Sequence, residues 1–273
     1  MATIDYTRVI RSARDSRTRA ARWRAFRSNV PGVVLRVVSI ALFLLVWSVF
    51  SLLPWAVQVP SPADVLNSAL HLDATEFAHD LWLSASRVIL GFVIAAIVGI
   101  PLGIVIGHSQ ILRDLLFTPV ELLRPVPPIA WIPLAILFFP EIDWMIIFLT
   151  FYGAFFPIVY NTVAGVSNIR ATYVRAGQSL GASKWTLFWE VVLPAALPVI
   201  FTGLYIAIGV AWLMVVAGEM IANKGGIGAL TWQSYQTTQY PMIFVGMASI
   251  GVLGYLSSLV VRGVARLVIR WEQ

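Results

Sequence analysis

The chain has 273 residues, of which 59% are hydrophobic and 12% are charged, and its mean hydropathy is +0.83. Soluble domains carry about 25% charged residues, so this composition excludes a soluble enzyme, and its apolar content excludes a disordered chain. The chain has no Cys and three His, which excludes disulfides and thiolate metal sites. We therefore expect an all-α integral membrane protein with no catalytic residues and no metal site of its own.

Residues 1–32 form a basic segment, with eight Arg between Arg8 and Arg27. A basic segment directly before a hydrophobic span is typical of a cytoplasmic tail beside anionic lipid. Nucleic acid is the less favoured alternative, so no nucleic-acid partner is expected. The apolar run that follows is too long for a signal peptide, and an Arg-rich transit peptide is a remaining alternative. We treat the segment as a basic tail of the mature protein.

Six apolar stretches, each long enough to cross a bilayer, occupy residues 33–273, with approximate bounds of 33–53, 82–107, 115–139, 144–166, 192–217 and 243–261. An even number of spans places both termini on one side. Most Lys and Arg outside the spans share that side, whereas the other side holds Lys224 among acidic residues. The positive-inside rule therefore predicts cytoplasmic termini. The 54–81 connection is predicted to hold a short outer helix that begins at Ser61.

The sequence has no phosphate-binding loop of the GxxxxGK[ST] type, so any ATP that drives transport must bind another chain. Ionisable residues within the spans are few, which disfavours a proton relay. We predict that Arg87 is an anchor reaching toward the outer interface and that Glu219 is solvated at the outer end of the fifth span. Glu121 and Arg124 are spaced to neutralise each other as an i,i+3 pair.

Prolines interrupt the third span at positions 125, 127, 128 and 133, and proline breaks or kinks a helix because it lacks an N–H donor. Broken helices within a bilayer often mark transport pathways, and a packing kink is an equally weighted alternative. Trp131 is placed to narrow such a pathway. The residues predicted to line or gate the pathway are Arg124, Pro127, Pro128, Trp131, Tyr205, Trp212 and Glu219.

Gly99, Gly103 and Gly107 form two overlapping GxxxG spacings in the second span. This flat glycine face permits close packing of a second helix. The spacing does not distinguish a contact within the chain from a contact with a second copy.

The cytoplasmic loop at about 168–190 is predicted to form an elbow of two short helices. Gly181 is placed to end the first helix in a left-handed conformation, and Ser183 is placed to cap the second. An apolar bend exposed to the cytosol is expected to be covered by other protein surface. That surface belongs either to the chain's own spans or to a soluble partner, for which aromatic side chains are suitable anchors. The apolar faces of the two helices consist of Tyr173, Ala176 and Leu180, and of Trp185, Phe188 and Val192.

The stretch RAGQSLGASKWTLFWEVVLPAALP at 175–198 resembles the EAA loop of binding-protein-dependent ABC importer permeases. That pattern is Glu-Ala-Ala, three residues, Gly, nine residues, Ile, one residue, Leu-Pro. Its Gly falls on Gly181, its Ile position on Val191 and its final Pro on Pro194. The opening triplet departs from the pattern and reads Arg-Ala-Gly at 175–177.

Further stretches, at 84–107, at 123–139 and at 215–221 with 225–228, are similar to the subgroup that moves sulfonates, taurine, nitrate and bicarbonate. The resemblance covers about 60–261. It implies a six-helix type I permease bundle in the bacterial cytoplasmic membrane, with no cofactor of its own. It also implies a second permease copy in a homodimer, two cytosolic ATPase subunits that hold ATP and Mg, and an extracytoplasmic solute-binding protein. The resemblance alone favours a small anion as the solute.

The resemblance implies that the elbow inserts into a groove of the ATPase. Closure of the ATPase dimer would then move the elbow and the attached fourth and fifth spans. The alternatives are a secondary carrier or channel that works without ATP, and a membrane scaffold that moves no solute. The residues that the resemblance assigns to ATPase coupling are Tyr173, Arg175, Ala176, Gly177, Leu180, Gly181, Ala182, Ser183, Trp185 and Pro194.

Overall fold

The computed structural model describes residues 32–56 and 58–269. They belong to two compact units, divided between Asp64 and Val65. The predicted basic tail, with the eight Arg between Arg8 and Arg27, lies outside the described residues.

The first unit contains the helix α2, Gly32–Ser51. Apart from Arg36 near its start, this helix carries no charged residue and has apolar side chains on all its faces, which is typical of a helix in contact with lipid. The helix α3, Pro62–Leu70, begins where the sequence predicts. The Asp64 carboxylate accepts hydrogen bonds from the backbone and the hydroxyl of Ser61, at 3.0 and 2.7 Å.

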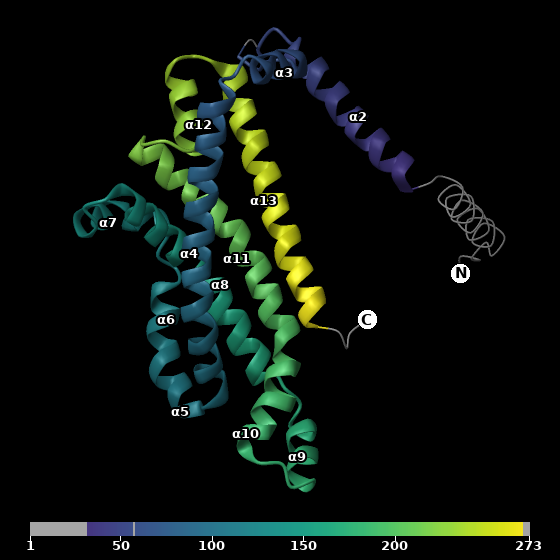
Figure 1. Ribbon diagram of the computed structural model, residues 1–273, viewed down its shortest axis with the longest axis vertical. Helices are drawn as coiled ribbons and strands as arrows, with labels where there is room; N and C mark the ends of the chain where they lie inside the picture. Colours follow the sequence, from purple (N-terminus) through teal and green to yellow (C-terminus); the bar gives the residue numbers. More distant parts are fainter. Residues whose placement is uncertain (1–31, 57, 270–273) are drawn as a thin grey trace, which may run out of the picture. The chain divides into compact units, whose positions relative to one another are not determined.

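The second unit is a bundle of four long helices: α4 (Ala74–His108), α8 (Ile142–Ser167), α11 (Leu193–Ala222) and α13 (Tyr240–Val268). Figure 1 shows α4, α8 and α11 side by side along the bundle. The helix α8 is the most buried of them and packs extensively against both α4 and α11. Aliphatic and aromatic side chains of α4, α7, α8 and α11 form the main core.

Glycines of α4 provide the contact surface with α8. A Cβ at Gly103 would lie 2.6 Å from the Thr162 Cβ, and a Cβ at Gly99 would lie 3.0 Å from the Ile158 Cγ2. The predicted glycine face is therefore a contact within the chain, and it extends beyond the predicted motif to Gly91, which faces Thr150. Because residue numbers rise together along this contact, α4 and α8 run parallel.

The third predicted span is broken into two helical halves, Gln110–Leu123 and Pro128–Phe138, which are bent by 85° relative to each other. The first half consists of α5 (Gln110–Leu112), η1 (Arg113–Phe117) and α6 (Thr118–Leu123), and the second of η2 (Pro128–Trp131) and α7 (Ile132–Phe138). The Tyr152 hydroxyl donates to the Leu123 carbonyl at 3.0 Å, which gives this backbone oxygen a hydrogen-bond partner at the break. The described residues thus hold five candidate spans, or six if this bent pair is one span.

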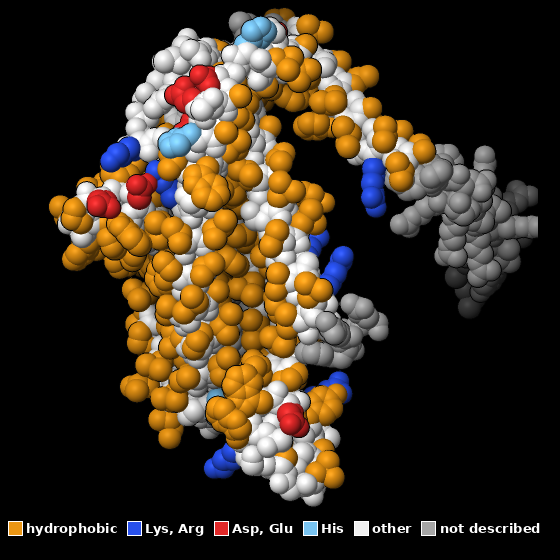
Figure 2. All heavy atoms as spheres, viewed as in Figure 1, with side chains coloured by type: hydrophobic (Ala, Val, Ile, Leu, Met, Phe, Trp, Pro, Cys, Tyr) orange, Lys and Arg blue, Asp and Glu red, His pale blue; other side chains and the backbone are white. Residues whose placement is uncertain are grey.

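Short helices close the two ends of the bundle. The elbow consists of α9 (Ala171–Ser179), α10 (Lys184–Leu187) and the π-helical segment η3 (Phe188–Val192), which leads directly into α11. The helix α12, Ile227–Gln236, lies at the opposite end in Figure 1. Hydrophobic side chains cover the middle of the bundle on the face shown in Figure 2, whereas Asp and Glu side chains lie toward its ends.

Candidate functional site

The elbow has a defined hinge. Gly181 adopts a left-handed conformation with φ of 79°. Its N–H donates to the Gln178 carbonyl at 3.0 Å, and the Ala182 N–H donates to the Gly177 carbonyl at 3.0 Å. These two bonds form a Schellman motif, the common helix ending that uses glycine. The Ser183 hydroxyl accepts from the Thr186 N–H at 3.1 Å, so the predicted stop and the predicted cap are both confirmed.

The outer surface of the elbow is apolar and exposed. Tyr173, Leu180 and Trp185 are 53%, 88% and 71% exposed. Trp185 also contacts the Trp189 ring, with 5.6 Å between the ring centroids. The sequence left open whether the chain's own spans or a soluble partner covers the elbow. The spans do not cover these three side chains. Arg175 and Ala176 are exposed on the same short helix, whereas Ala182 and Pro194 are half-buried.

The inner surface of the elbow packs closely on itself. Leu187 and Val192 are buried, and a Cβ at Gly177 would lie 2.5 Å from the Leu187 Cδ2. Glycine at this position, where the family pattern has alanine, thus allows α9 to approach α10. The prediction that Trp185 and Val192 share one face is wrong, because the π-helical turn of η3 widens the helix and directs Trp185 outward and Val192 inward.

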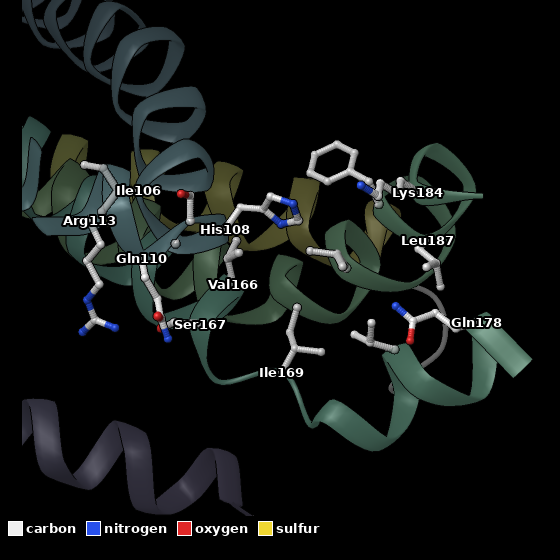
Figure 3. Close-up of a pocket in the computed structure, with 15 residues that line it drawn as sticks. Ile106, His108, Gln110, Arg113, Val166, Ser167, Ile169, Gln178, Lys184 and Leu187 are labelled. Carbon is white, nitrogen blue, oxygen red and sulfur yellow. The ribbon is translucent and has the colours of Figure 1, made fainter. Parts of the chain in front are cut away.

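A cavity of about 550 Å³ lies between the elbow and the ends of α4 and α8. In Figure 3, His108 and Val166 line it from the bundle, and Gln178 and Leu187 line it from the elbow. The elbow therefore meets the bundle around a hollow space rather than through a continuous packed interface.

Arg124 lies at the break in the third span. Its guanidinium is 4.4 Å from the centre of the Tyr160 ring, and no ion pair joins it to Glu121 within the described part of the chain. The predicted i,i+3 pair is wrong, because α6 ends just before Arg124 and the side chain reaches α8 instead. A cavity of about 360 Å³ brings Arg124 and Pro128 together with residues of α8 and α11.

The other predicted pathway residues are dispersed. Trp131 packs against Tyr152, with 5.2 Å between the ring centroids, and lines a separate apolar cavity. Trp212 is buried, and its indole N–H donates to the Ser257 hydroxyl at 3.1 Å. Tyr205 contacts Arg262 of α13 through both its hydroxyl and its ring. Pro127 is exposed just before η2.

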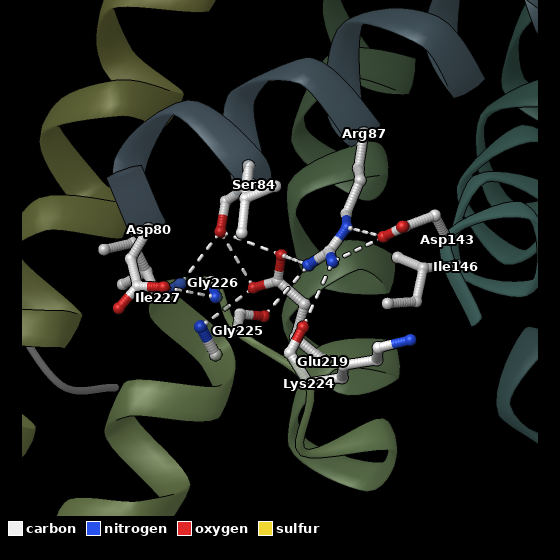
Figure 4. A network of polar contacts seen from close by, with 12 residues as sticks. Asp80, Ser84, Arg87, Asp143, Ile146, Glu219, Lys224, Gly225, Gly226 and Ile227 are labelled. Carbon is white, nitrogen blue, oxygen red and sulfur yellow. Dashed lines mark hydrogen bonds and ion pairs between the residues drawn. The ribbon is translucent and has the colours of Figure 1, made fainter. Parts of the chain in front are cut away.

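A buried polar network joins three long helices at the end of the bundle opposite the elbow (Figure 4). Arg87 of α4 contacts the carboxylates of Asp143 and Glu219, with 2.6 Å between nitrogen and oxygen in each pair. The Ser84 hydroxyl donates to the Glu219 carboxylate at 2.8 Å. Arg87 is 3% exposed and Glu219 is fully buried, so the predictions of an interfacial anchor and of a solvated carboxylate are both wrong.

The same network holds the glycine-rich turn before α12. The N–H groups of Gly226, Ile227 and Gly228 donate to Asp80, Ser84 and Glu219, at 2.7, 2.9 and 2.9 Å. Gly226 has φ of 100°, and a Cβ there would overlap the Glu219 carboxylate. Glycine is therefore required where this turn crosses the ion pair.

A sequence signal for this network existed. Asp80, Ser84 and Arg87 are spaced by four and three residues, which places three polar groups on one face of an apolar helix. Arg87 and Glu219 each lie near the end of a different span, so neither residue alone indicates their pairing.

The long apolar helices of this fold define a multi-pass helical membrane protein. The chain matches the family described as "Binding-protein-dependent transport system inner membrane component" over residues 99–272, and it belongs to that family. It is the permease component of an ABC importer. Membership implies association with an ATPase and with a solute-binding protein.

Curated relatives include the nitrate import permease NrtB of Synechocystis sp., which is 35% identical over 89% of this chain and 92% of its own length. The taurine transport system permease TauC of Escherichia coli is 34% identical over 93% and 95%. The bicarbonate transport system permease CmpB of Synechococcus elongatus is 34% identical over 95% and 98%. The MetNI methionine ABC transporter in inward-facing conformations matches with a TM-score of 0.62 and 18% identity, over 71% of this chain and 97% of the matched chain, which supports the fold.

Proposed function

We propose that this permease forms, with a second copy of itself, the translocation pathway for a small oxyanion, and that a separate ATPase drives it. ATP and Mg belong to the ATPase, and an extracytoplasmic solute-binding protein delivers the solute. The nitrate, taurine and bicarbonate relatives support the substrate class. Their three named solutes share a planar or pyramidal group of three oxygens around one central atom.

The observation that carries the ATPase-driven mechanism is the exposed apolar elbow. Three large side chains, Tyr173, Leu180 and Trp185, project from two short helices. An exposed apolar patch of this kind favours a protein partner, and Trp and Tyr are frequent anchors of such interfaces. The elbow is therefore the proposed docking element for the ATPase.

The connections of the elbow explain how its movement reaches the pathway. Its second arm continues from α10 through η3 into α11 without a loop, and its first arm follows α8 after a short connection. A displacement of Trp185 therefore acts on the two helices that form the centre of the bundle. ATP stabilises one orientation of these helices only if the ATPase binds that orientation more tightly.

The charges of the same elements support an orientation of the chain. The elbow and the residue before it carry Arg170, Arg175 and Lys184, whereas the opposite end holds Lys224 among the acidic residues Asp80, Glu141 and Asp143. The positive-inside rule places the elbow in the cytosol. With the bent pair counted as one span, the number of spans is six, and both termini are then cytoplasmic, in a bacterial inner membrane.

Reconstitution into proteoliposomes tests the proposal. The full-length chain, its ATPase and its solute-binding protein are assembled, and uptake of labelled nitrate, bicarbonate and taurine is measured with and without ATP. Uptake of one of these solutes that requires ATP and both partners is expected. Uptake by the permease alone, without the ATPase, would overturn the proposal in favour of a carrier or channel.

The elbow is tested separately by Gly181→Asp and Trp185→Ala. Both variants are expected to lose co-purification of the ATPase and uptake together. Glu141→Gln at the opposite end of the bundle serves as a control and is expected to leave ATPase association unchanged. Normal association in both elbow variants would contradict the docking role.

A further inference from the structure

The cavity beside Arg124 combines an arginine with polar side chains on an otherwise apolar surface. Arg124 and Val126 line it from the break in the third span, Tyr160 and Asn161 from α8, and Ile206 from α11. Its volume of about 360 Å³ exceeds the roughly 30 Å³ that a water molecule occupies in the liquid. A small solute therefore fits between these helices.

Arg124 lies at the break between the two halves of the third span, and no carboxylate of the described residues forms an ion pair with it. Arg87, which is buried within α4, is by contrast paired with Asp143 and Glu219. That site has one positive and two negative charges, so it repels an anion. At a rise of 1.5 Å per residue, the two sites are separated by about 25 Å along α8, from Asp143 to Tyr160.

Tyr160 supplies a hydroxyl that has no partner of its own. Its ring lies under the Arg124 guanidinium at 4.4 Å and against Phe117 at 5.0 Å. The hydroxyl oxygen is buried and forms no hydrogen bond with any described residue. Buried hydroxyls are nearly always hydrogen-bonded, because an unsatisfied one is costly. Tyr160 lines the adjoining cavity, and a small rotation of its side chain would let a ligand there satisfy the hydroxyl.

Asn161 adds a second neutral donor at a fixed position. Its Nδ2 donates one hydrogen to the Pro157 carbonyl at 2.8 Å, and the second hydrogen of the amide remains for a ligand. A Cβ at Gly203 would lie 2.6 Å from the Asn161 Cβ, so close packing of α11 holds this side chain in place.

We propose that Arg124, Tyr160 and Asn161 form an oxyanion-binding station within the translocation pathway. The guanidinium fork binds two oxygens of a group with three oxygens, and the hydroxyl and the amide donate to the third. The inference rests on the proposed function, since it assigns a site to the proposed substrate class.

The assembled transporter in proteoliposomes tests this station, with labelled nitrate, bicarbonate and taurine as the probes. Arg124→Gln is expected to lower ATP-dependent uptake at least about tenfold, as expected for loss of a charge-assisted hydrogen bond. Arg124→Lys retains the charge but not the fork, so an intermediate rate is expected. Tyr160→Phe keeps the ring under Arg124 and removes only the hydroxyl, and a loss of about threefold or more is expected.

Two measurements separate binding from folding. ATPase co-purification and basal ATP hydrolysis are expected to stay within about twofold of wild type in all three variants. Arg266→Gln, near the end of α13, is the control for removal of an exposed arginine. Normal uptake by Arg124→Gln, or a loss matched by loss of ATPase association, would overturn the station. If wild-type protein imports none of the three anions, the proposed substrate class fails instead.

Discussion

Arg87 and Glu219 form a buried ion pair between α4 and α11, with 2.6 Å between Nη1 and Oε1. Ser84 and the N–H of Gly228 occupy the remaining acceptor positions of the carboxylate. The pair therefore fixes two spans and the turn before α12 through a single carboxylate.

Removing one partner of this pair is expected to destabilise the protein strongly. Arg87→Met leaves Glu219 buried without its cation, and such a change costs about 3–5 kcal/mol. Asp143→Asn is the matched control, because the Asp143 side chain is 55% exposed and an exposed partner contributes about 1 kcal/mol or less. Thermal unfolding of the detergent-solubilised protein measures both, and equal losses would contradict the assigned burial.

The glycine face of α4 is expected to tolerate no side chain. Gly103→Ala places a Cβ 2.6 Å from the Thr162 Cβ, and overpacking of this kind costs about 1–3 kcal/mol. Gly209→Ala, where a Cβ has no neighbour within 4 Å, is the control and is expected to be neutral or stabilising. The unfolding temperatures of the two variants measure the difference, and a Gly103→Ala variant as stable as wild type would contradict the close contact between α4 and α8.

Restoring alanine at the third position of the family triplet is expected to impair this particular elbow. Gly177→Ala directs a Cβ at the Leu187 Cδ2, which separates α9 from α10 and lowers ATP-dependent uptake several-fold. The double variant Gly177→Ala with Leu187→Val removes the contacting methyl and is expected to recover part of the uptake. Absence of any coupling between the two substitutions in a double-mutant cycle would contradict the contact.

The cap of α4 is expected to make stability depend on acid. The N–H groups of Thr75 and Glu76 donate to the Asp73 carboxylate and lower its pKa. Because the folded-state pKa lies below the unfolded value of about 3.9, the stabilisation is present above that pH and is lost as pH falls through the folded pKa. Asp73→Asn keeps an acceptor without titrating, so its unfolding temperature should fall less steeply between about pH 5 and pH 3.

Features that depend on local sequence could be predicted. Gly181, Ser183 and Ser61 occupy their expected capping positions because these residue types satisfy helix ends through short-range bonds. The break at the prolines of the third span follows from the missing N–H donors, although the 85° bend depends on packing against α8.

Features that depend on distant partners could not be predicted from one residue at a time. Arg87 and Glu219 are separated by 132 positions, and each one alone resembles a residue near a membrane interface. Arg124 has an acidic residue three positions away, yet its guanidinium lies over Tyr160 of another helix. The packing that decides these partners is tertiary, so spacing along the chain does not show it.

The π-helical segment η3 has a mechanical consequence. It joins α10 to α11 as one continuous rod, so torque applied at the elbow twists the rod instead of bending a loop. The wider turn changes the angle, around the helix axis, between the side chains before it and the side chains after it. Removing one residue from that turn would rotate the elbow around the rod by roughly 100°. The proposed docking surface would then face away from the ATPase, while the contacts of α11 within the membrane stayed in register.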